Sequence, residues 1–135
     1  MKRGLLPISP AELIERALET LRARLLPHLE GEAERDAALL SFRALAIARA
    51  ELDSDPAIVA RELAEIEALV GQSFEGDAIA ARRALAAAIR AGQVPADGPA
   101  EVRLRDHLLT AAANRLRITN PKYLTRRKRR AESSY

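Results

Sequence analysis

Residues 9–25 read SPAELIERALETLRARL, and this stretch carries the clearest structural signal in the chain. The Ser9 side chain can accept a hydrogen bond from the backbone of Glu12, whose carboxylate can reach back to the backbone of Ser9. Pro10 suits the first helical position because its φ angle is already near the helical value. We therefore predict that an α-helix begins here. Its apolar residues recur at helical spacing and form one stripe: Leu13, Ile14, Ala17, Leu18, Leu21 and Leu25.

The same kinds of signal predict a second and a third helix. The second follows the acidic stretch 30–34 and ends at 53–56, where Asp-Ser-Asp-Pro interrupts it. We expect its buried side to consist of Leu40, Ala44, Leu45, Ile47, Ala48 and Leu52. Asp55 and Pro56 start the third helix, and Gly71 is placed to end it.

A fourth and a fifth helix complete the pattern. Asp77 can cap the fourth, which ends at Gly92. The fifth runs from about residue 99 to residue 118, where Asn120-Pro121 closes it. The apolar residues expected to face inward are Ile79, Leu85, Ala88 and Ile89 in the fourth helix and Val102, Leu109, Ala112 and Leu116 in the fifth.

Composition supports an all-α fold. Hydrophobic residues make up 48% of the 135 residues, mostly as Ala and Leu, and aromatic residues only 3%. Ala and Leu lead the helix propensity scale, whereas sheets prefer β-branched and aromatic side chains. The length fits one domain. We predict a compact bundle of about five mostly antiparallel amphipathic helices in residues 1–124, because short loops join neighbouring helices antiparallel.

Positive charge is concentrated near the C-terminus. Residues 122–130 hold six of the 22 basic residues and no acid, while residues 1–121 hold 16 basic and 18 acidic residues. We expect the tail, residues 125–135, to be disordered, because it is charged and poor in apolar side chains. The basic run could contact phosphates through Arg126, Arg127, Lys128, Arg129 and Arg130. Nucleic acid is not our expected partner, because only Tyr123 could stack on bases.

The sequence offers no catalytic constellation. It has no cysteine, no phosphate-binding glycine loop and no zinc-protease motif. His28 follows a helix end, and we interpret His107, in the fifth helix, as a surface or partly buried residue. Carboxylate pairs such as Glu62 and Glu65 are interpreted as solvated and partnered by arginine. We expect no enzyme activity, no metal, no cofactor and no membrane span, and a cytoplasmic location.

A small-ligand site is an alternative reading. Arg90 can be combined with Lys122 in an anion site, although Arg90 also complements the dipole of its own helix. A site between helices for a CoA-like or phosphate-bearing molecule would use five candidate residues: Arg90, Asn120, Lys122, Tyr123 and His107.

Two segments together resemble a small bacterial helical family of unknown function. Residues 85–92 read LAAAIRAG and residues 116–124 read LRITNPKYL, and the segments 9–13 and 25–29 fit as well. The second helix departs from the family, which has an Arg-Val-Ala-Ala-Asn type segment where this chain has LLSFR at 39–43. Any role of the family's Asn or Arg in that segment therefore does not transfer to this chain.

Members of this family tend to be encoded beside acyl-CoA dehydrogenases and aminoglycoside-phosphotransferase-like kinases. The resemblance therefore implies an accessory protein that binds one of these enzymes. Three hypotheses stand: a non-enzymatic interaction domain, a ligand-binding protein, and nucleic-acid binding through the tail. Self-association is also open, because an Ala-rich bundle can bury a spare helix face on a copy of itself.

Overall fold

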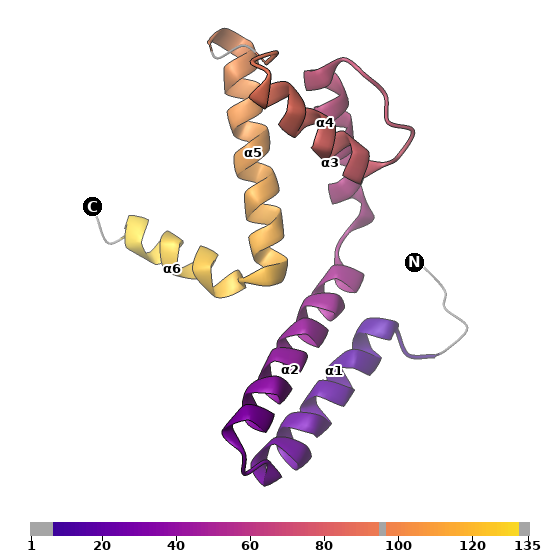
Figure 1. Ribbon diagram of the computed structural model, residues 1–135, viewed down its shortest axis with the longest axis vertical. Helices are drawn as coiled ribbons and strands as arrows, with labels where there is room; N and C mark the ends of the chain where they lie inside the picture. Colours follow the sequence, from indigo (N-terminus) through magenta and orange to yellow (C-terminus); the bar gives the residue numbers. More distant parts are fainter. Residues whose placement is uncertain (1–6, 95–96, 133–135) are drawn as a thin grey trace. The chain divides into compact units, whose positions relative to one another are not determined.

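The computed structural model describes residues 7–94 and 97–132, and within these residues it contains helices and no strand (Figure 1). The all-α prediction is thus confirmed. The α-helices are α1 (Pro10–Thr20), α2 (Glu32–Asp53), α3 (Pro56–Val70), α4 (Ala78–Arg90), α5 (Gly98–Thr119) and α6 (Pro121–Glu132).

Contacts between Cα atoms divide the chain into two compact units. The first ends at Ser54 and contains α1 and α2, and the second begins at Asp55 and contains α3 to α6. Each unit has its own packing. That residues 1–124 form one domain stays a prediction.

The first unit begins as the sequence predicts. The Glu12 amide donates to Ser9 Oγ at 3.1 Å, and the Ser9 amide donates to Glu12 Oε2 at 2.9 Å. This reciprocal pair satisfies two of the amides that the start of a helix leaves without a partner. The Ser9 hydrogen bonds also lower the pKa of the Glu12 carboxyl, since they favour its charged form.

After α1 the chain continues through two irregular helical turns, and Pro27 lies in the second. A π turn, η1 (Leu21–Leu25), follows Thr20, and a 3₁₀ turn, η2 (Leu26–His28), follows that. Pro27 cannot donate a backbone hydrogen bond, so regular helix cannot continue through it. Arg35 of α2 donates through Nη1 to the carbonyl oxygens of Leu26 and Leu29, at 3.3 and 3.4 Å, and so covers this end.

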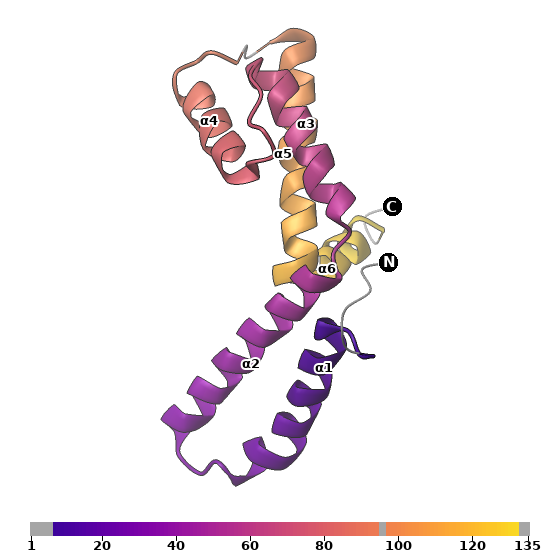
Figure 2. The ribbon, with the colours of Figure 1, turned by 90° about the vertical axis from the view of Figure 1, so that its right-hand side faces the viewer.

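The two helices of the first unit lie side by side and antiparallel (Figures 1 and 2). Leu18 of α1 and Phe42 of α2 are buried between them, and Glu15 pairs with Arg49 Nε at 2.7 Å.

The predicted buried side of α2 is wrong. Leu40 is 70% exposed, and Leu45, Leu52 and both alanines of the predicted side are exposed as well. Successive helical residues are turned by about 100°, so Phe42 lies on nearly the opposite side from Leu40. The large aromatic ring is the side chain that packs against α1.

In the second unit, the predicted caps are confirmed. Asp55 Oδ1 accepts from the Ala57 amide at 2.9 Å, and Asp77 Oδ1 accepts from the amides of Ile79 and Ala80. Gly71 ends α3 with φ +73°, a left-handed backbone conformation that residues other than glycine adopt at an energetic cost. The core cluster joins α3 and α4 and consists of Ile66, Ala81 and Leu85.

Several predicted inward residues of the second unit are exposed instead. Ile79 is 61% exposed, and Val102 and Leu109 of α5 are exposed too. The buried residues of α5 are His107 and Ala111, which are four positions apart and so share a face. The inward face of α5 is therefore about opposite to the predicted one, and a polar residue, His107, lies on it.

The predicted disorder of the tail is wrong for residues 125–132. They belong to α6, which begins at Pro121 directly after Asn120 and runs to Glu132. Pro121 fits the first position of a helix, so the residue that closes α5 also starts α6. Residues 133–135 lie outside the described part of the chain.

None of the helices in the described part of the chain has both the length and the apolar character that crossing a bilayer requires.

The core assignment can be tested by stability. Ile66 is 1% exposed, so Ile66→Ala should lower the free energy of unfolding by about 2–5 kcal/mol. Ile79→Ala removes the same atoms from an exposed position and should change it by about 0.5 kcal/mol or less. Urea denaturation followed by circular dichroism measures both, and equal losses would contradict the assigned core.

Candidate functional site

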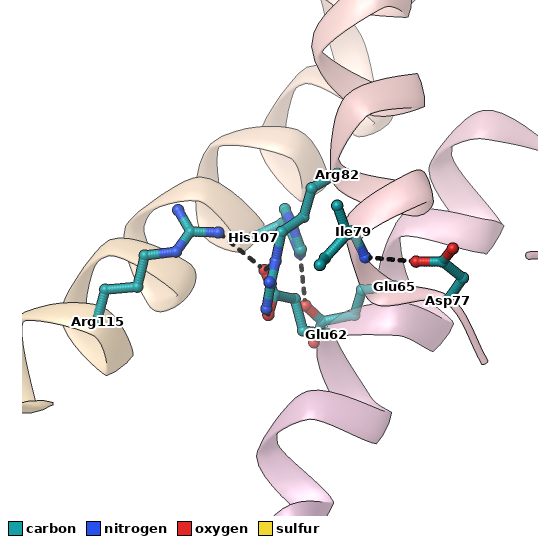
Figure 3. A network of polar contacts seen from close by, with 7 residues as sticks. All are labelled: Glu62, Glu65, Asp77, Ile79, Arg82, His107 and Arg115. Atoms are coloured by element: carbon teal, nitrogen blue, oxygen red, sulfur yellow. Dashed lines mark hydrogen bonds and ion pairs between the residues drawn. The ribbon is translucent and has the colours of Figure 1, made fainter. Parts of the chain in front are cut away.

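A polar network joins three helices of the second unit (Figure 3). His107 of α5 is only 5% exposed, and its Nδ1 lies 2.8 Å from Glu65 Oε2 of α3. A carboxylate oxygen only accepts, so Nδ1 is the donor and carries a ring proton. In the neutral ring this leaves Nε2 as an acceptor. Burial of a polar ring without such a partner would be unfavourable, and Glu65 provides one.

Glu62 is the centre of the network. It accepts from Arg82 Nε at 2.9 Å and Nη2 at 2.5 Å, and from Arg115 Nη2 at 3.2 Å. Hydrogen bonding by Arg82 is the main reason that the pKa of the Glu62 carboxyl is lowered. Burial acts in the opposite direction, since the Glu62 side chain is only 12% exposed, but the two guanidinium groups prevail.

The local sequence explains how these groups meet. Glu62 and Glu65 are three residues apart on α3, so they lie on the same face of that helix. Arg82 reaches Glu62 from α4, while His107 and Arg115 approach the two carboxylates from α5 (Figure 3). The network therefore fixes the positions of α4 and α5 on α3 through two carboxylates.

A groove of about 380 Å³ lies beside His107. Its polar lining includes Arg61, Glu65, Thr110, Asn114 and Arg117, and its apolar lining includes Ile58 and Ala111. Two smaller hollows, of about 280 and 220 Å³, also reach His107. His107 thus lines all three cavities, and charged residues of both signs line them as well.

The structure separates the residues that the sequence suggested for one ligand site. Of the five residues predicted for this site, His107 alone lines the groove and the two hollows. Arg90 lies in the last turn of α4, Asn120 is the C-cap of α5, and Lys122 and Tyr123 belong to the first turn of α6. These four residues are exposed and line none of the three cavities around His107.

Three other interpretations of the sequence can be compared with the structure. Glu62 is indeed partnered by arginine, as proposed for the carboxylate pairs, but it is largely buried rather than solvated. His28 is exposed in η2. The basic residues 126–130 are exposed on α6.

The partners of His107 were missed because they depend on long-range contacts. Glu65 is 42 residues away from His107, and Glu62 is 20 from Arg82 and 53 from Arg115. One local signal existed: Glu62 and Glu65 each directly precede an apolar residue of the third helix, Leu63 and Ile66. Within the residues that the structure describes, no group of three or more potential metal ligands lies together.

Glu62 gives a testable dependence of stability on pH. Its pKa in the folded protein is below the ordinary value of 4.5, so its stabilising effect is complete above that pH and is lost as the pH falls through the folded pKa. Glu62→Gln should cost about 1–3 kcal/mol of unfolding free energy at neutral pH. The difference from the unsubstituted protein should shrink at about pH 3.

Urea denaturation at the two pH values measures this effect. Glu101→Gln is the matched control, because Glu101 pairs with Arg105 at 2.6 Å within one helix and at the surface. The control should change stability little at either pH. A Glu62→Gln cost that does not change with pH would contradict the role assigned to the carboxylate charge.

Comparison with known proteins identifies the family. A family model described as a domain of unknown function (DUF6285) matches residues 27–123. The matched segment contains every residue of the His107 network and leaves out α1 and most of α6. Searches of curated proteins and of solved structures gave no match. Because the family model covers most of the chain, this protein belongs to the DUF6285 family.

Proposed function

We propose that this protein is a non-enzymatic accessory domain of the bacterial cytoplasm, which binds a partner enzyme through α2. The observation that supports the proposal is an uncovered apolar face of this helix, here called the outer stripe. It consists of Ala37, Leu40, Ala44, Ile47 and Ala48. Ile47 is half-buried and the other four are exposed, Leu40 most of all.

The outer stripe has the spacing of a helix-binding surface. Its residues recur at intervals of three and four, so they line one side of α2, about opposite to Phe42. The face that carries Phe42 is covered by α1. A helix that is apolar on two opposite sides is typical of a helix packed on both sides. The alanines would let a partner helix approach closely around the Leu40 side chain.

The resemblance noted in the sequence suggests the class of partner. Its relatives are expected beside phosphotransferase-like kinases and acyl-CoA dehydrogenases, and this chain shows no catalytic motif of its own. In an accessory role, the partner enzyme would carry out the catalysis, and this protein would bind and position that enzyme. We therefore expect the partner to be the phosphotransferase-like or dehydrogenase-like enzyme encoded beside it.

Substitution in the outer stripe tests the proposal. Leu40→Glu places a charge on an exposed side chain, so it should leave the thermal unfolding temperature nearly unchanged. In the interface it would bury an unpaired charge and should weaken binding about 100-fold or more. The measurement is co-purification of the tagged chain with each co-expressed enzyme, followed by titration calorimetry of the pair that binds.

Leu52→Glu is the matched control. It makes the same change on the same helix, at an exposed leucine about 100° around from the centre of the outer stripe. Binding should survive this substitution. If neither enzyme binds, and light scattering shows a homo-oligomer that Leu40→Glu dissociates, the outer stripe serves self-association and the proposed partner is wrong.

The groove beside His107 favours a second candidate function, the binding of a small phosphate-bearing molecule such as a CoA-like compound. Arg61 and Arg117 line the groove and could pair with phosphate. Asn114, Thr110 and the free ring nitrogen of His107 could bind amide or hydroxyl groups. Asp55 and Glu65 line it as well, so a ligand with hydrogen-bond donors beside its anionic group fits best.

Two arginine variants distinguish the groove from the site suggested by sequence. Arg61→Gln should weaken the binding of coenzyme A about 10-fold, by removing a charged partner of phosphate. Arg90→Gln removes the same charge from outside the groove and should have no effect. Isothermal titration with coenzyme A measures both. Equal weakening by the two substitutions, or no heat with the unsubstituted protein, would rule the groove out.

A further inference from the structure

Because the basic run belongs to a helix, its side chains point in fixed directions relative to one another. Within α6 every residue is exposed except Leu124, which is half-buried. At about 100° per residue, four cations share one side of the helix. We call this side the basic face, and it consists of Lys122, Arg126, Arg129 and Arg130. Leu124 lies about opposite to it.

Most of the basic face lies outside the family domain. Most of α6 lies beyond residue 123, where the match to the family ends, so the family domain does not include the basic run. Among the described helices, α6 packs mainly against α5. It contains one acid, Glu132, against six cations. A strong local positive charge of this kind attracts polyanions.

The chemistry of α6 discriminates between polyanions. A helix that lies in a membrane surface needs a broad apolar face, but α6 offers only Leu124 and Tyr123 as large apolar side chains. Binding of single strands relies on several stacking aromatic residues, and α6 has one. The phosphates of a duplex need neither, since paired cations on a rigid helix are sufficient to bind them.

The dimensions of the basic face favour B-form DNA. From Lys122 to Arg130 the helix rises about 12 Å at about 1.5 Å per residue. The major groove of B-DNA is about 12 Å wide and admits an α-helix, whereas the major groove of A-form RNA is deep and narrow. A helix fits this groove by its diameter, and the long Lys and Arg side chains along these roughly 12 Å could reach the phosphates that flank the groove.

We propose that α6 binds double-stranded DNA through its phosphates, without sequence preference, using the basic face. This function is independent of the partner bound by α2. Four phosphate contacts predict that affinity falls about 150-fold between about 50 and 200 mM salt, from a slope of about −0.9 per contact.

The experiment uses the full chain and a labelled duplex of about two helical turns, followed by fluorescence anisotropy over that salt range. The double variant Lys122→Gln/Arg126→Gln removes two cations of the basic face. It should weaken binding at least about 10-fold at low salt and halve the salt slope. Arg127→Gln/Lys128→Gln removes the same charge from the other sides of α6 and should weaken binding less than about threefold.

Each remaining outcome counts against the proposal. Equal losses in the two double variants would mean that charge alone matters and that no basic face exists. No binding at about 50 mM salt would exclude DNA. Tighter binding to a single strand, or to phosphatidylserine-containing vesicles, would show that a different polyanion is preferred. A second duplex of unrelated sequence should bind as well as the first, and a strong preference would contradict the phosphate-only mode.

Discussion

The carboxylate of Glu62 is the contact on which the second unit depends. Two arginines from different helices donate to it, and Glu65, one turn further along α3, holds the buried imidazole of His107. Removing one member of such a network is costly, because the remaining groups keep their charge or polarity in a partly buried place. The network therefore complements the small core of Ile66, Ala81 and Leu85, since it specifies which faces of the helices meet.

The molecule carries three distinct surfaces, and each differs in chemistry. The outer stripe of α2 is apolar, the groove beside His107 has charges of both signs, and the basic face of α6 is cationic. The segment that matches the DUF6285 model contains the first two surfaces but only Lys122 of the basic face, because it ends at residue 123. A shared role of the family would rest on α2 or on the groove, whereas the basic face would be an addition to it.

Local signals in the sequence predicted the helix starts well because their physics is local. Ser9, Asp55 and Asp77 each accept from backbone amides within three residues, so no distant contact is needed for the prediction. The faces were harder to predict. In α2 both the side of Phe42 and the side of Leu40 are apolar, and periodicity cannot say which one α1 covers. The prediction of a disordered tail was wrong because it relied on composition, whereas Pro121 starts a helix that runs to Glu132.

The all-α class, the starts of the capped helices and the concentration of positive charge near the C-terminus could be predicted from the sequence, because composition, caps and charge act at short range. The burial of His107, its pairing with Glu65 and the sharing of Glu62 by Arg82 and Arg115 became evident from the folded structure alone. Those pairs join residues 20 to 53 positions apart, and only the packing of α3, α4 and α5 brings them within hydrogen-bonding distance. Burial of a polar residue depends on such partners, and so it cannot be read from the residue alone.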